Sequence, residues 1–142
     1  MMEVQPFTIL DHTADIGLEA YGSNLEEAFI HAAEGMFSIL SPAAQIKYER
    51  SASFQIEAET VKELLIVWLN QLLYLYDAEK LLPGYFKIKK LDGNSLEAEI
   101  TGETVDPNKH KIDTYIKAAT YHETKIIQDK NGHFSLQVIF DV

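Results

Sequence analysis

The sequence predicts an α+β domain in which two amphipathic helices pack on a mainly antiparallel sheet. Two segments place apolar residues at helical spacing behind N-capping signatures, and much of the remaining chain alternates apolar and polar residues as half-buried strands do. Two clusters of turn-forming residues between such segments indicate β-hairpins. A length of 142 residues and a hydrophobic content of 46% are typical of a single domain, here spanning residues 1–142.

The N-terminal part is expected to form two short strands and a helix. Residues 5–10 and 16–21 are the predicted strands. The helix is predicted over residues 24–40, where apolar side chains recur every three or four positions. Ser23, with Glu26 three residues later, has the pattern of a capping box, so the helix is expected to begin there.

The middle of the chain is expected to form a strand and a long central helix. Residues 46–58 are the predicted strand, and Thr60 with Glu63 forms a second capping box. The helix that follows is apolar over a wide face, and the residues that mark its buried side are Leu64, Leu65, Trp68, Leu72 and Leu75. Pro83-Gly84 is expected to end the connection after this helix.

The C-terminal part is expected to be strands. One hairpin is predicted over residues 85–104, turning at Asp92-Gly93-Asn94. A second is predicted over residues 112–141, turning at Lys130-Asn131-Gly132. Two amphipathic helices against a mainly antiparallel sheet make an α+β layer architecture.

Charge and composition narrow the classes of function. Twenty-two acidic residues against twelve basic ones give a net charge of −10, which repels a phosphate backbone, so stable direct binding to nucleic acid is not expected. The longest apolar segment, Leu64 to Leu75, is too short to span a membrane, and the N-terminus has no signal-peptide pattern. The absence of cysteine excludes thiolate metal sites and fits a reducing compartment, so we expect a cytoplasmic protein.

Both ends of the chain carry candidate ligands for a cation. The run DHTAD, residues 11–15, either shapes a turn between the first two strands or supplies carboxylate oxygens to a hard cation. At the other end, Asp141 and the terminal carboxylate of Val142 would converge on Asp15 if the last strand lay beside the first. Carboxylates so close would repel one another unless a cation lay between them. The alternative is an exposed polar tail.

A third motif, KAATYH, contains a candidate basic residue. Strand periodicity would place Lys117 on one face with Ala119 and Tyr121, where it either contacts a phosphate or carboxylate or is an ordinary surface lysine. His12 and His122 match no local metal-binding spacing, and they serve either as structural hydrogen-bonding residues or as one half of an acid–base pair. Phosphate-binding loops, nucleophile elbows and zinc-protease motifs are absent from the sequence, so the residues alone indicate no autonomous enzyme.

Taken together, these motifs resemble the archease family. The likeness rests on HTADI at residues 12–16 with the GLEAYG that follows, the helix start SNLEEAF at 23–29, KAATYH at 117–122 and the terminal FDV, and it runs from end to end. It implies a strand-helix-strand-strand module with an insertion. It also implies a non-enzymatic accessory protein of an RtcB-type RNA ligase, acting in tRNA splicing and RNA repair. Such proteins promote guanylylation and multiple turnover of the ligase and broaden its nucleotide use from GTP to ATP.

The resemblance also implies site residues. A divalent metal would be held by Asp15, Asp141 and the terminal carboxylate of Val142. Ca²⁺ is the usual occupant in structures of the family, and Mg²⁺ or Mn²⁺ suits the same oxygen ligands. Asp15 and Lys117 match positions implicated in activating the ligase.

The other two polar residues of DHTAD are expected to have supporting roles. Asp11 stands where many family members have Glu, and its shorter reach leaves it out of the expected ligands. Together with His12 it is expected to shape the turn and to support the ligands by hydrogen bonds. Two other functions stay open, a small chaperone or interaction module with wider clients and a metal-dependent hydrolase using Asp15 and His12. Assays of aggregation and of phosphoester hydrolysis separate them from ligase activation.

Overall fold

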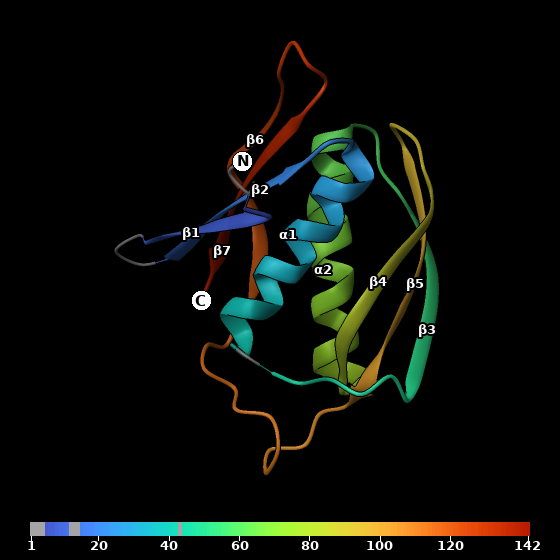
Figure 1. Cartoon of the computed structure of the whole chain (residues 1–142), viewed down its shortest axis with the longest axis vertical. Coiled ribbons are helices and arrows are strands. Elements are labelled where there is room, and N and C mark those ends of the chain that lie inside the picture. Colours follow the sequence, from blue (N-terminus) through green and yellow to red (C-terminus); the bar gives the residue numbers. More distant parts are fainter. Residues whose placement is uncertain (1–4, 12–14, 43) are drawn as a thin grey trace.

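The two helices lie between two antiparallel sheets. The computed structural model describes residues 5–11, 15–42 and 44–142. Within them, α1 (Leu25–Leu40) and α2 (Val61–Glu79) form a central layer with a sheet on either side (Figure 1). The prediction of an α+β fold with two helices is confirmed, but the strands divide between two sheets instead of forming one.

The first sheet brings the two ends of the chain together. Its four antiparallel strands follow the order β1-β2-β7-β6, so the second and the last strands pair at its centre. The strands are β1 (Phe7–Asp11), β2 (Asp15–Gly22), β6 (Ala118–Gln128) and β7 (Phe134–Asp141). One face of the sheet packs on α1 and the beginning of β6 packs on α2.

The second sheet belongs to an insertion. Its three strands follow the order β3-β5-β4, and they are β3 (Arg50–Glu57), β4 (Leu81–Leu91) and β5 (Ser95–Thr104). Together with α2 they occupy the stretch of chain between α1 and β6. The elements β2, α1, β6 and β7 therefore form a strand-helix-strand-strand module, with the insertion supplying the second helix and the second sheet.

Side-chain caps begin both helices. Asn24 is the N-cap of α1, where its side chain accepts a hydrogen bond from the Glu27 N–H at 2.8 Å, and the Glu27 carboxylate accepts one from the Ser23 N–H at 3.1 Å. The cap thus lies one residue beyond the predicted Ser23, because Asn24 and Glu27 repeat the same pattern one position later. For α2, Thr60 accepts from the Glu63 N–H at 3.1 Å, as predicted.

Neither of the two helices in the described part of the chain has the length and apolar character needed to cross a membrane.

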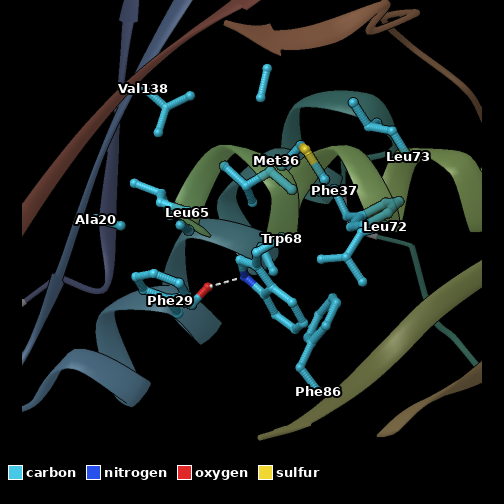
Figure 2. Close-up of a cluster of buried hydrophobic side chains, with 14 of the residues drawn as sticks. Ala20, Phe29, Met36, Phe37, Leu65, Trp68, Leu72, Leu73, Phe86 and Val138 are labelled. Atoms are coloured by element: carbon cyan, nitrogen blue, oxygen red, sulfur yellow. Dashed lines mark hydrogen bonds between the residues drawn. The ribbon is translucent and has the colours of Figure 1, made fainter. Parts of the chain in front are cut away.

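Trp68 connects α2 to α1 and to the second sheet. Its indole is fully buried and its N–H donates to the backbone carbonyl of Phe29 in α1 at 2.9 Å (Figure 2). The same ring packs against Phe54 of β3 and Phe86 of β4, with centroid distances of 5.8 and 6.4 Å. A single side chain of α2 therefore contacts both the other helix and the second sheet.

Three strands begin four or more residues away from the predicted position. Pro83-Gly84 lies inside β4, since β4 is an edge strand and a register shift after Pro83 accommodates the missing N–H. β3 begins at Arg50 and not at residue 46. β6 begins at Ala118 and not at residue 112, because residues 105–117 cross irregularly from the second sheet to the first.

We predict that Trp68→Ala lowers the free energy of unfolding by about 3–5 kcal/mol, because it leaves a large cavity between the helices and the second sheet. The matched control is Tyr74→Ala on the same helix, whose exposed ring should change stability by no more than about 0.5 kcal/mol. Urea unfolding followed by circular dichroism measures both. Equal effects of the two substitutions would contradict the assignment of Trp68 to the core.

Candidate functional site

Asp15 and Asp141 face each other at one end of the first sheet. Asp15 begins β2, Asp141 ends β7, and the two residues are direct antiparallel partners. Their neighbours Ile16 and Phe140 pack in the core, so strand alternation places both carboxylates on the face away from the helices. Both line an open pocket of about 310 Å³, whose other lining residues are Thr120, His122, Ile139 and Phe140.

The donor chemistry of this pair fits a hard divalent cation. Two carboxylates opposed across neighbouring strands repel each other, and a cation between them removes that penalty. Two aspartates do not fill the six to eight positions around Ca²⁺, and within the described residues no third carboxylate or imidazole converges with them. Val142 follows Asp141 directly and packs partly buried against the core, and the role of its terminal carboxylate as a ligand stays a prediction.

The two residues expected to support the site are Asp11, at the end of a described segment, and His12, next to it in the sequence. The backbone of Asp11 ends β1, where it pairs with Ile16. His12 lies outside the described residues. The supporting roles of Asp11 and His12 therefore stay predictions.

Lys117 adjoins this pair through its backbone. The Lys117 N–H donates to the carbonyl oxygen of Asp141 at 2.8 Å. The residue precedes β6 and is exposed, whereas Ala119 is buried and Tyr121 is again exposed. The single face predicted for these three residues is therefore wrong, because regular alternation begins only after Lys117 and is broken again beyond Thr120.

Asn70 of α2 fixes the start of β6. Its side-chain Oδ1 accepts a hydrogen bond from the Ala119 N–H at 2.8 Å, and its Nδ2 donates to the Ala119 carbonyl at 3.1 Å. This amide therefore pairs with the strand as a neighbouring strand would, and it satisfies both backbone groups of a buried residue. Sequence reasoning missed this role, although a polar residue within an otherwise apolar helix face was the available signal.

A wide bulge in β6 borders the pocket. The register with β7 shifts between Thr120 and Lys125, and Glu123 within the bulge has a left-handed backbone with φ of 51°. Gln137 of β7 holds this turn by donating from Nε2 to the Glu123 carbonyl at 2.9 Å. The bulge places the exposed imidazole of His122 on the pocket rim.

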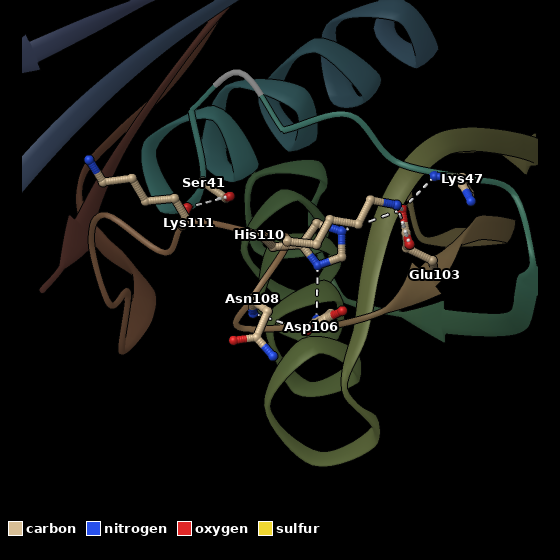
Figure 3. Close-up of polar contacts among 8 residues, drawn as sticks. Ser41, Lys47, Glu103, Asp106, Asn108, His110 and Lys111 are labelled. Carbon is tan, nitrogen blue, oxygen red and sulfur yellow. Dashed lines mark hydrogen bonds and ion pairs between the residues drawn. The ribbon is translucent and has the colours of Figure 1, made fainter.

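A buried carboxylate anchors the chain segment that leads to Lys117. Both oxygens of Glu103, near the end of β5, accept from the Lys109 ammonium at 2.8 Å, and Oε2 also accepts from the Lys47 N–H at 2.6 Å (Figure 3). These bonds, first that from Lys109, lower the pKa of Glu103 to about 2, and His110 contributes in the same direction.

The same segment is held at two further points. The Nδ1 of the buried His110 accepts from the Asp106 N–H at 2.9 Å, so the ring proton of the neutral imidazole lies on Nε2, 3.4 Å from Glu103. Ser41, just after α1, donates to the carbonyl of Lys111 at 2.7 Å. The crossing segment is therefore fixed to both the insertion and α1 before it reaches the site.

Comparisons with known proteins agree along almost the whole chain. Residues 7–142 match the archease protein family. The chain is 37% identical to protein archease of Sulfurisphaera tokodaii over 98% of its own length and all of that protein, and 38% identical to protein archease of Pyrococcus furiosus over 93% and 95%. The solution structure of protein 1598 of Methanobacterium thermoautotrophicum matches with a TM-score of 0.83 and 34% identity, covering 96% of this chain and 99% of that one.

We predict that Glu103→Gln removes part of the pH dependence of stability. Because the pKa of Glu103 in the folded protein is about 2, below its ordinary value of 4.5, the unfolded chain takes up the proton first as pH falls. The stabilisation is therefore full above the ordinary value and is lost as pH falls through 4.5 towards 2. Urea unfolding between pH 7 and pH 2 should show wild type and variant converging on acidification. Glu57→Gln, on an exposed part of β3, is the control, and a pH-independent gap for Glu103→Gln would refute the assignment.

Proposed function

This chain belongs to the archease family, and from that membership we propose that it activates an RtcB-type RNA ligase in tRNA splicing and RNA repair. It promotes guanylylation and multiple turnover of the ligase and broadens nucleotide use from GTP to ATP, without being a ligase itself. The observation that supports this best is the meeting of Asp15, Asp141 and the backbone of Lys117 at one end of the first sheet.

The site residues divide into anionic and cationic groups. Asp15, Asp141 and the terminal carboxylate of Val142 would hold the divalent cation, which supplies positive charge for a phosphate oxygen of the ligase's nucleotide. The backbone of Lys117 adjoins this pair, its side chain is exposed, and an ammonium is a good partner for phosphate. The Asp141 carbonyl accepts the Lys117 N–H, and the Asp141 side chain is the group proposed to bind the cation.

The charge of the protein supports docking on a protein and not on RNA. A net charge of −10 favours approach to a basic surface, such as one built to hold RNA and nucleotide, and disfavours binding to the RNA itself. We propose that docking is transient and that it occurs in the cytoplasm. A general chaperone is the competing function, and it predicts no selectivity for one ligase.

We predict that the protein makes an RtcB-type ligase turn over repeatedly. The assay uses limiting ligase, RNA with a 2′,3′-cyclic phosphate and a 5′-hydroxyl end, and GTP or ATP. Multiple turnover and use of ATP should appear only with this protein. Asp15→Ala and Lys117→Ala should abolish the effect while leaving the circular dichroism spectrum and thermal midpoint close to wild type.

Lys130→Ala, in the exposed turn between β6 and β7, is the matched control and should stimulate fully. Failure to stimulate the ligase of the same organism would overturn the proposal. Protection of unrelated proteins from aggregation would then favour the chaperone. Unfolding of the Asp15 or Lys117 variants would instead assign those residues structural roles.

We predict that Ca²⁺ binding, measured by isothermal titration calorimetry, depends on both aspartates. Asp15→Asn and Asp141→Asn each remove an anionic ligand and should weaken binding by at least about tenfold. Residues appended after Val142 should also weaken it, because they replace the terminal carboxylate with an amide. Asp113→Asn, on the exposed crossing segment, is the control. Unchanged affinity in the extended protein would remove Val142 from the ligands.

A further inference from the structure

A second pocket lies on a different part of the molecule from Asp15 and Asp141. It has a volume of about 350 Å³, and the C-terminal half of α1, every second residue of the segment 44–48 and the beginning of β4 line it. Its apolar floor includes the rings of Phe37 and Phe86, which stack with centroids 6.1 Å apart and an interplanar angle of 30°. Each of these two residues is 7% exposed. None of the residues lining it belongs to the site described above.

The aromatic ring of Tyr48 lines one side of this pocket. It is 64% exposed, yet its hydroxyl donates to the Gly84 carbonyl at 3.4 Å and its ring lies 6.1 Å from that of Tyr85. Gly84 makes this packing feasible, because a Cβ there would lie 2.9 Å from Tyr48 Cε1 and 2.8 Å from Ile46 Cβ. Tyr48 therefore presents a large exposed aromatic surface, and tyrosine is enriched among the residues that contribute most to protein binding.

Glu34 gives the pocket a negative charge. It is the one charged side chain among the described residues that line it. The side chain of Glu34 is 47% exposed. Its partial burial raises the pKa of the carboxyl, and the charge of the nearby His31 acts to lower it. Lys47 lies in the adjoining segment but does not line the pocket. A bound cation would therefore compensate a carboxylate that water solvates only in part.

We propose that this pocket receives an arginine side chain of a basic partner protein, with the guanidinium stacked on Tyr48 and paired with Glu34. A guanidinium is planar, weakly hydrated and suited to both an aromatic face and a carboxylate, whereas a lysine ammonium is more strongly hydrated. A nucleotide would bring phosphates towards Glu34 and a chain of net charge −10. The identity of the partner as the RNA ligase rests on the proposed function, but the preference for arginine does not.

The preference is tested by nuclear magnetic resonance with a defined probe. Nα-acetyl-arginine methylamide is titrated to tens of millimolar into ¹⁵N-labelled protein, alongside the matching citrulline and lysine compounds. The arginine compound should shift amides of Phe37, Tyr48 and Gly84, and neutral citrulline should shift them far less. Glu34→Gln and Tyr48→Ala should each weaken binding by about two- to fivefold, whereas Glu57→Gln and Tyr74→Ala should not.

Equal shifts from citrulline, or no shifts at these amides, would overturn the proposal. Stronger shifts from adenosine than from the arginine compound would also overturn it, in favour of a nucleobase site. Because Tyr48→Ala exposes the apolar floor, its thermal midpoint is compared with that of Glu34→Gln, which changes charge at nearly constant shape. Retained binding in a folded Glu34→Gln variant would contradict the role of the carboxylate.

The ligase assay separates this inference from the proposed function. If the pocket docks the ligase, Glu34→Gln should raise the concentration of this protein that gives half-maximal stimulation by about two- to fivefold and leave the plateau unchanged. Asp15→Ala should instead lower the plateau. Binding of the arginine probe without any stimulation by wild type would overturn the proposed function and support the pocket. Full stimulation with an unchanged half-maximal concentration in both pocket variants would overturn docking there.

Discussion

The need to cover the central helix layer on two sides determines the architecture. In α2 the buried residues occupy most of the circumference, and they include Leu64, Leu65, Ile66, Trp68, Leu69, Leu72, Leu73 and Leu75. One sheet covers only one face of such a helix, so the remaining apolar surface requires a second cover. The module supplies the first sheet, the insertion supplies the second, and Trp68 contacts elements of both parts. The insertion is therefore an integral part of the core.

The candidate site lies at one end of the first sheet. Nearby, a buried backbone segment needs hydrogen-bond partners, and these partners fix the position of the strand beside the site. Asn70 projects from the central layer and pairs with Ala119, which fixes the start of β6. The Lys117 N–H then reaches the Asp141 carbonyl, next to Asp15. Glu103 anchors the other end of the crossing segment. Polar groups that stabilise the fold thus also determine where the charged groups of the site lie.

Features with local causes could be predicted from the sequence. The helices and hairpins follow from periodicity, caps and turn residues. The N-cap of α1, Asn24, lies only one position beyond the predicted Ser23. The proximity of Asp15 and Asp141 depended on strand order, which local patterns do not determine. The division into two sheets, the strand position of Pro83 and the roles of Asn70 and Glu103 arise from contacts between distant segments. A single sequence read locally contains no record of such contacts.

The central position of β7, between β2 and β6, also determines when the first sheet can form during synthesis. Among the described strands it is the last along the sequence and its partner β2 is the second, so their pairing closes a loop that contains most of the described residues. Topologies dominated by such distant pairings fold slowly. Until β7 leaves the ribosome, β2 lacks a neighbour on one side, and its open edge can associate with other unfinished strands. Asp15 meets Asp141 only through this pairing, so a chain that displays both carboxylates together has already joined β2 to β7.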